Sequence, residues 1–164
     1  MRLSARADIA AEPAAVFAEL TEFERFERMA LQAGAEVVRA DALDAPDAGM
    51  EWVVKAPIRG RMRRVRVTLV DIHSDERLEF HATSPNFDMT SEIVLIAPRP
   101  GKTRLQIAFD IRPKTLASRI TLQSAKLRKA TLSRRFDERV KGLARLIEDR
   151  IAEKAGRFGA ATRS

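Results

Sequence analysis

The stretch RLQIAFDIRP, residues 104–113, decides the fold predicted for this 164-residue chain. Every second side chain in it is large and apolar: Leu105, Ile107, Phe109 and Ile111. A period of two is typical of a strand with one buried face and one solvated face. Pro113 then ends the strand, because proline has no amide hydrogen to donate to a neighbouring strand. The stretch therefore predicts a sheet that is covered on one face only.

The same alternation recurs upstream. Turn-forming segments rich in Gly, Pro, Asp, Asn and Ser separate the alternating stretches, and no internal repeat is present. Alternation on one face is typical of an antiparallel sheet covered by helices on its dry side. We therefore predict an α+β fold with a sheet of about seven strands. The predicted strands are 3–9, 36–42, 50–56, 61–72, 78–83, 87–96 and 105–112.

Two short helices are predicted between the first two strands. Pro13 stands at a first helical position, where its missing amide hydrogen is not needed. Apolar residues then recur at spacings of three and four, which places them on one helix face. Thr21–Glu22 marks a break between the two helices, and Gly34 closes the second. The apolar residues are Val16, Phe17, Leu20, Phe23, Phe26, Met29 and Ala30.

One long helix is predicted after Pro113, with about 35 to 40 residues ending near Ala155. We therefore expect one domain over residues 1–155 and a flexible tail over 156–164. The helix carries a core-facing apolar stripe: Leu122, Ala125, Leu132, Phe136, Val140, Leu143, Ile147 and Ile151. The core predicted for the whole chain is Val16, Phe17, Leu20, Val67, Leu69, Phe80, Ile107, Phe109, Phe136, Val140, Leu143 and Ile147.

A second apolar stripe, formed by Leu116, Ile120 and Leu127, lies roughly opposite the first on a regular helix. Two structural explanations are open. The first turns are enclosed between the sheet and a loop, or a break near residues 113–115 separates a short helix. The third explanation is functional: the stripe is a surface for a membrane, a second protomer or a nucleic acid.

Positive charge is concentrated in the predicted long helix. The chain has a net charge of +7, yet residues 1–113 hold 16 Lys/Arg against 18 Asp/Glu. Residues 114–154 hold 12 against 5, with no acid before Asp137. Cations in the first turns oppose the helix dipole, so helix stability alone does not favour this arrangement. The charge favours acidic partners, although a solvated basic surface is the commoner explanation.

Composition and motifs exclude several classes of function. The chain has no Cys, which excludes disulfides and cysteine nucleophiles, and no apolar run approaches the roughly 18 residues of a membrane span. The N-terminus predicts a strand rather than a signal peptide, so the cytoplasm is the expected compartment. His73 and His81 are the only histidines, and His81 falls on the wet face. No nucleophile motif or phosphate loop is present. We assign no catalytic residue, metal or cofactor.

Residues 9–23, IAAEPAAVFAELTEF, resemble the opening of bacterial polyketide-cyclase and lipid-transport-like proteins. The order of one strand, two short helices, six strands and a long helix is similar to the helix-grip architecture of the START and plant-allergen-like superfamily. The resemblance implies a curved antiparallel sheet around the long C-terminal helix. It also implies a cavity between them for an apolar or amphipathic small molecule.

From this resemblance we expect a carrier or binding protein rather than an enzyme. A polyketide cyclase or dehydratase is the alternative, because a shaped pocket with one or two titrating groups is sufficient for cyclisation. Lys129, on the core-facing stripe, either reaches solvent or anchors a ligand carboxylate or phosphate. The apolar candidates, each also explained by ordinary core packing, are Trp52, Met62, Phe80, Phe87, Met89, Phe109 and Phe136.

The basic half of the long helix gives a second alternative, docking on an anionic membrane. Its apolar stripe is flanked by cations, a pattern typical of helices that rest on anionic lipid. RNA is less favoured, because no aromatic residue interrupts the basic run to stack on bases. The oligomeric state is left open. The candidate surface residues are Leu116, Arg119, Ile120, Lys126, Leu127, Arg134 and Arg135.

Overall fold

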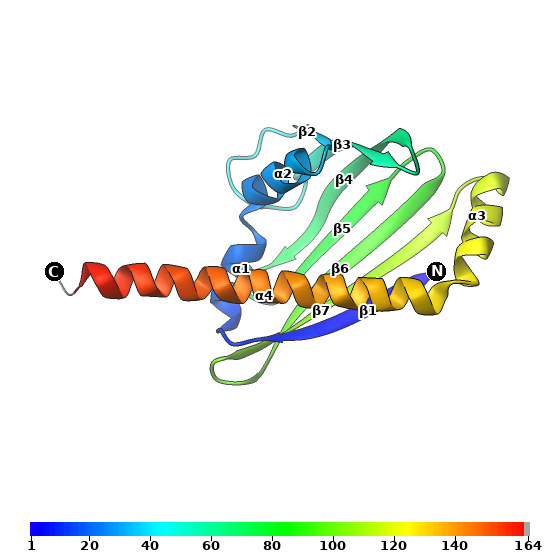
Figure 1. Ribbon diagram of the computed structural model, residues 1–164. Helices are drawn as coiled ribbons and strands as arrows, with labels where there is room; N and C mark the ends of the chain where they lie inside the picture. Colours follow the sequence, from blue (N-terminus) through cyan, green and yellow to red (C-terminus); the bar gives the residue numbers. More distant parts are fainter. Residues whose placement is uncertain (163–164) are drawn as a thin grey trace.

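A single antiparallel sheet forms one layer of the molecule, and helices cover one of its faces (Figure 1). A computed structural model describes residues 1–162. Its seven strands lie in the order β1-β7-β6-β5-β4-β3-β2. They are β1 (Arg2–Ile9), β2 (Glu36–Arg39), β3 (Glu51–Ile58), β4 (Arg61–His73), β5 (Arg77–Thr83), β6 (Phe87–Arg99) and β7 (Lys102–Pro113). The predicted α+β class and seven-stranded antiparallel sheet are confirmed.

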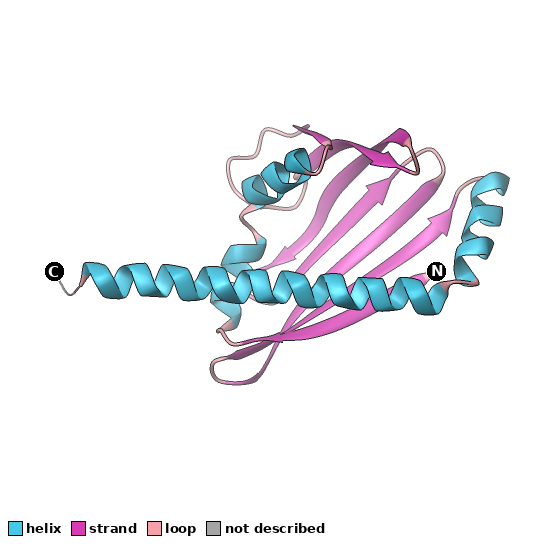
Figure 2. Cartoon of the chain, viewed as in Figure 1, coloured by secondary structure: helices cyan, strands magenta, loops and turns pink. Residues whose placement is uncertain are grey.

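The helices lie at two places over the sheet, as the cyan ribbons of Figure 2 show. α1 (Pro13–Leu20) and α2 (Phe23–Gln32) connect β1 to β2, and α2 packs beside β2. After β7 come α3 (Leu116–Lys126) and α4 (Lys129–Ala161). α4 packs chiefly on β1, at the other edge of the sheet. Its C-terminal turns extend past the sheet (Figure 1).

The register of the strands places their alternating apolar residues on the face under the helices. Leu105 of β7 pairs with Ala7 of β1 and with Leu95 of β6, and both Leu105 and Leu95 are buried. A β-bulge between Leu69 and Asp71 shifts the register of β4 by one residue. A bulge of this kind bends a strand, which contributes to the curvature of the sheet.

Seven of the predicted core residues are buried: Val16, Phe17, Leu20, Leu69, Ile107, Val140 and Ile147. The other five are half-buried and pack against that core: Val67, Phe80, Phe109, Phe136 and Leu143. Three of the half-buried residues lie on β4, β5 and β7, and two lie on α4. Parts of the helix-covered face are therefore less completely buried than the sequence predicts.

The predicted single long helix is wrong in one respect, because the chain bends at Leu127–Arg128 between α3 and α4. α3 starts with a capping box, in which the Thr115 hydroxyl oxygen accepts from the Ser118 amide at 3.1 Å. It packs against β7, whereas α4 packs on β1. α3 buries Ser118 and Leu122, whereas the opposite stripe of Leu116, Ile120 and Leu127 stays exposed, so the bend does not bury the second stripe. α4 also continues to Ala161, past the predicted end at Ala155, and residues 163–164 of the predicted tail lie outside the described residues.

Candidate ligand-binding site

A cavity of about 280 Å³ lies between α2 and the sheet. The spacing of α2 explains its contribution, because residues 23, 26, 27 and 30 fall on one face of a helix. The strands contribute side chains from the face that alternation marks as apolar. We call this space the α2 cavity. Its lining residues are Leu20, Phe23, Phe26, Glu27, Ala30, Val37, Trp52, Val54, Val67, Leu78, Phe80 and Ile93.

Three aromatic rings form a contiguous part of the wall. The Phe23 ring packs edge-on against Trp52, with centroids 5.2 Å apart, and against Phe80, with centroids 6.1 Å apart. Trp52 and Phe80 complete the triangle with a centroid separation of 6.4 Å. Edge-to-face pairs of this kind add about 0.5–1.5 kcal/mol beyond the area they bury. The rings are therefore held by one another in the absence of a ligand.

Glu27 is the one ionisable side chain among the described residues that line the cavity. Trp52 Nε1 donates a 2.8 Å hydrogen bond to Glu27 Oε1, and an Arg39 guanidinium nitrogen lies 4.0 Å from the same oxygen. Glu27 Oε2 has no hydrogen-bond partner among residues 1–162. One carboxylate oxygen is therefore fixed by the protein, and the other is free to accept a hydrogen bond.

Arg39 beside the cavity is already committed to other partners. It binds Asp41 in a bidentate manner, through bonds of 2.9 Å from Nε and 2.6 Å from a terminal nitrogen. Its guanidinium also lies over the Trp52 ring, 5.5 Å from the centroid. The pair with Arg39 lowers the pKa of Asp41, and the pKa of Arg39 is raised chiefly by the bond to Asp41. This cation is thus neutralised before any ligand arrives.

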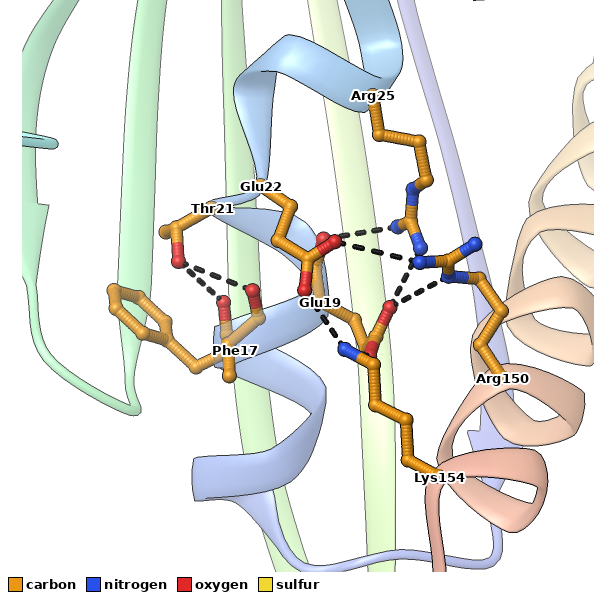
Figure 3. Close-up of polar contacts among 8 residues, drawn as sticks. Phe17, Glu19, Thr21, Glu22, Arg25, Arg150 and Lys154 are labelled. Atoms are coloured by element: carbon orange, nitrogen blue, oxygen red, sulfur yellow. Dashed lines mark hydrogen bonds and ion pairs between the residues drawn. The ribbon is translucent and has the colours of Figure 1, made fainter. Parts of the chain in front are cut away.

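A buried ion cluster holds the corner between α1 and α2 against α4 (Figure 3). Glu19, only 2% exposed, accepts from Arg25 at 2.6 Å, from Arg150 at 2.9 Å and from Lys154 at 2.5 Å. Lys154 also donates to Glu22 at 2.8 Å, and the pKa of Lys154 is raised, chiefly by its bond to Glu19. Because Leu20 and Phe23 neighbour these residues in the chain, the cluster fixes the start of α2 over the α2 cavity. Sequence analysis did not identify this cluster.

The α2 cavity brings together two of the eight residues predicted to bind a ligand, Trp52 and Phe80. Met62 is exposed on the β3–β4 hairpin. Phe109 packs against Phe136 of α4, with centroids 5.4 Å apart. Lys129 is the first residue of α4 and is exposed. The predicted placement of Lys129 on a core-facing stripe is therefore wrong, because the bend before it turns the helix.

The position of the α2 cavity also differs from the prediction. We expected a cavity between the sheet and the long helix, yet none of the described lining residues comes from α3 or α4. Phe87 and Met89, on β6, are half-buried and lie outside the lining. The lining residues that were not predicted had a local signal in the sequence. Positions 23, 26, 27 and 30 have the spacing of one helix face, and Val54 and Val67 follow the alternation of their strands.

The predicted apolar surface stripe lies on the solvent side of α3 and the bend after it. Leu116, Ile120 and Leu127 are 75%, 59% and 89% exposed. Arg119 and Lys126 are exposed beside them and form no ion pair with any residue from 1 to 162. Arg134 and Arg135, in the first turns of α4, are also exposed. The structure therefore leaves this stripe uncovered.

The sequence matches the family described as polyketide cyclase / dehydrase and lipid transport over residues 1–148. The chain belongs to this family. No curated protein matches it at a significant level. Within residues 1–162, no helix is both long enough and apolar enough to cross a membrane, and no three His, Asp or Glu side chains gather as metal ligands.

Solved structures show the same fold at low sequence identity. The protein TTHA0849 from Thermus thermophilus has a TM-score of 0.64 and 17% identity, covering 94% of this chain and 99% of its own. The Zhui aromatase/cyclase from Streptomyces sp. R1128 has a TM-score of 0.62 and 13% identity, and the match covers 88% of this chain and 93% of the cyclase. A START superfamily protein from Mycobacterium smegmatis has a TM-score of 0.56 and 13% identity, and the match covers 87% of this chain and 98% of that protein. The helix-grip fold is therefore confirmed.

Proposed function

We propose that the protein binds an apolar small molecule in the α2 cavity. The observation that carries the proposal is the space itself, which has aromatic and aliphatic walls and Glu27 as its one ionisable lining residue among those described. Ligand pockets are typically apolar, with few polar groups that fix the orientation of the ligand. The volume of about 280 Å³ is near the lower end of the range for such pockets, roughly 300–1,000 Å³. A chain of about ten carbons is a suitable probe.

Trp52 provides an internal reporter for this proposal, because it is the only tryptophan and it lines the α2 cavity. Titration with 1-decanol is expected to change its fluorescence in a saturable manner. The variant Ala30→Phe places a ring in the α2 cavity and is expected to weaken binding at least about tenfold. Ala155→Phe, on an exposed part of α4, is the matched control and is expected to bind as the natural sequence does. Unchanged binding by a folded Ala30→Phe protein would contradict the proposal.

A cyclase or dehydratase acting on a polyketide-like substrate is the alternative use of the same cavity. Glu27 is the observation that favours it, since a carboxylate beside an apolar substrate can act as a general base. Carriage is ranked first because one oxygen of Glu27 is already held by Trp52. Native mass spectrometry of protein purified from cells distinguishes the two. A carrier retains an unmodified apolar ligand, whereas an enzyme releases a chemically changed product.

We also propose that α3 docks on an anionic membrane surface. The motivating observation is the exposed stripe of Leu116, Ile120 and Leu127 beside Arg119 and Lys126, two cations with no ion-pair partner in the described part of the chain. Each cation near such a surface contributes about 1 kcal/mol, so several are sufficient for weak, reversible docking. A second copy of the chain is a poorer occupant, because residues 114–136 contain no acid and two such surfaces would repel one another.

Co-sedimentation with liposomes tests the docking proposal. Binding is expected to increase with the fraction of anionic lipid and to decrease with salt. Replacing Leu116 and Ile120 with Ser is expected to reduce binding, and Lys126→Glu is expected to reduce it further. Arg145→Glu, on exposed α4, is the control for net charge. The absence of binding at low salt, or RNA binding that survives the Ser replacements, would contradict a membrane role.

A further inference from the structure

The β3–β4 hairpin ends in a short basic segment, residues 57–64, which we call the hairpin tip. We propose that the hairpin tip is a second membrane contact, and that it docks together with α3 on one anionic bilayer. The inference rests on the docking proposed for α3 and adds a separate element to that surface.

The cations of the hairpin tip have no acidic partners within the described residues 1–162. Residues 52–70 contain six Lys or Arg and no Asp or Glu. The cations that flank the tip are paired, Lys55 with Glu36 and Arg66 with Glu51. The tip itself carries four exposed arginines without an ion pair: Arg59, Arg61, Arg63 and Arg64.

Apolar side chains stay exposed between these arginines. Ile58, which pairs with Arg61 across the hairpin, is 46% exposed, and Met62, which pairs with Pro57, is 55% exposed. The combination suits an anionic membrane, because the cations attract its headgroups and the apolar side chains are buried at the acyl boundary. An RNA would bind the charges but would leave Ile58 and Met62 in water.

The turn at the hairpin tip is an unfavourable place for arginine. Its two central residues, Arg59 and Gly60, have φ values of 51° and 74°, in the left-handed region. Asn, Asp and Gly are preferred at the first of these positions, because most residues with a Cβ are destabilised at positive φ. The stability of the turn therefore does not explain Arg59, whereas a charge at the outermost point of the hairpin contributes to docking.

The strand register places the hairpin tip and α3 at the same end of the sheet. Arg66 of β4 pairs with Thr83, the last residue of β5, so residues 61–65 project past the end of β5. At that end, the Lys114 amide, just before α3, donates to the Asn86 carbonyl oxygen at 2.9 Å. Figure 1 shows the β3–β4 hairpin and α3 at this end and the β6–β7 hairpin at the other. One bilayer surface therefore meets both basic, apolar elements.

Single-cysteine variants carrying an environment-sensitive NBD dye test the inference, because the chain has no Cys of its own. The variants are Met62→Cys, Leu116→Cys and, as the control at the opposite end of the sheet, Arg99→Cys. The probes are vesicles of phosphatidylcholine, alone and mixed with phosphatidylserine. We expect NBD emission to increase and shift to shorter wavelength at positions 62 and 116, with the anionic vesicles only, and to stay unchanged at position 99.

The dye responses separate the inference from the docking proposal on which it rests. A response at Leu116→Cys alone would overturn the hairpin contact and leave α3 docking in place. A response at Met62→Cys alone would overturn the joint surface. No response at either position would overturn the docking proposal as well. Binding of poly(U) RNA without any binding of anionic vesicles would overturn the membrane as the occupant of both elements.

Arg61→Gln combined with Arg63→Gln removes two charges from the hairpin tip. The double variant is expected to bind the anionic vesicles about tenfold more weakly in co-sedimentation, because each cation near the surface adds to the attraction. Arg99→Gln, an exposed arginine at the end of β6, is the matched control and is expected to change the affinity less than about twofold. An unchanged affinity of the double variant would overturn the inference.

Discussion

α3 and α4 are adjacent helices of similar residue composition, but they place their apolar residues in opposite environments. Both combine branched apolar residues with Lys and Arg. In α4 the apolar stripe is packed on β1, and Ile147 is completely buried. In α3 the stripe that begins with Leu116 faces solvent, and Ile120 is 59% exposed. Composition alone therefore does not determine whether an apolar stripe becomes core or surface.

The cations of the two helices differ in the same way. Lys141 pairs with Asp137 at 2.7 Å on α4, and Arg150 and Lys154 both reach Glu19. On α3, Arg119 and Lys126 pair with no acid among residues 1–162. The cations of α4 that hold it to α1 therefore have acidic partners, whereas those of the α3 surface have none among residues 1–162. Three predictions test this distinction, from the largest expected effect to the smallest.

Glu19→Gln is expected to lower the free energy of unfolding by about 3–5 kcal/mol, because Arg25 is left buried without a compensating charge. Urea denaturation at pH 7 measures the change. Glu22→Gln is the matched control, since Glu22 shares Arg150 and Lys154 but is 40% exposed. Its expected cost is under about 1 kcal/mol. Similar costs for the two variants would show that the Glu19 cluster is not what anchors α4.

Ile147→Ala and Ile120→Ala make the same chemical change on the two helices. Ile147 is 0% exposed, so its truncation is expected to cost about 2–4 kcal/mol through lost burial and a residual cavity. Ile120 is 59% exposed, and its truncation is expected to cost less than about 0.5 kcal/mol. Both values come from urea denaturation. A large cost at Ile120 would mean that the α3 stripe is core and would remove the basis for membrane docking.

Lys154→Gln and Lys126→Gln compare a paired cation with an unpaired one. Lys154 is about half exposed, so Lys154→Gln is expected to lower the free energy of unfolding by less than about 1 kcal/mol. Lys126→Gln is expected to change it by about zero, because Lys126 is exposed and unpaired among residues 1–162. The folded-state pKa of Lys154 is raised above 10.5, chiefly by Glu19. Its contribution is therefore complete below pH 10.5 and is lost as the pH rises through the higher folded-state value. The difference in the free energy of unfolding between the natural sequence and Lys154→Gln should therefore be present at pH 7 and absent above the raised pKa. A difference that stays the same at both pH values would exclude the ion pair as its cause.

The strands were predictable because their signal is local. Alternation along residues 104–112 marks one face, and turn-forming segments such as 98–101 mark the ends. The bend at Leu127–Arg128 had no such local signal, since residues 114–141 contain neither Gly nor Pro. The second apolar stripe was no guide to it, because Leu116, Ile120 and Leu127 stay exposed in the bent arrangement.

The α2 cavity was only partly predictable. Trp52 and Phe80 were identified because they are aromatic and lie on the apolar face of their strands. Phe109 on β7 satisfies the same criteria, yet it packs against Phe136 of α4 and lies outside the cavity lining. Alternation identifies a face of the sheet but does not say which part of that face a helix leaves open. Which part stays uncovered depends on where α2 and α4 pack over the strands.

The sequence by itself determined the antiparallel sheet, the two short helices and the concentration of positive charge after Pro113. These follow from the periodicity of neighbouring residues and from composition. Tertiary structure alone decided the bend, the α2 cavity and the partners of Glu19, one of which is 131 residues away along the chain. Glu19 and Arg150 have no local pattern that links them, because their interaction exists only when the α1–α2 corner meets α4. The free carboxylate oxygen of Glu27 likewise depends on Trp52 and Arg39, which reach it from β3 and β2.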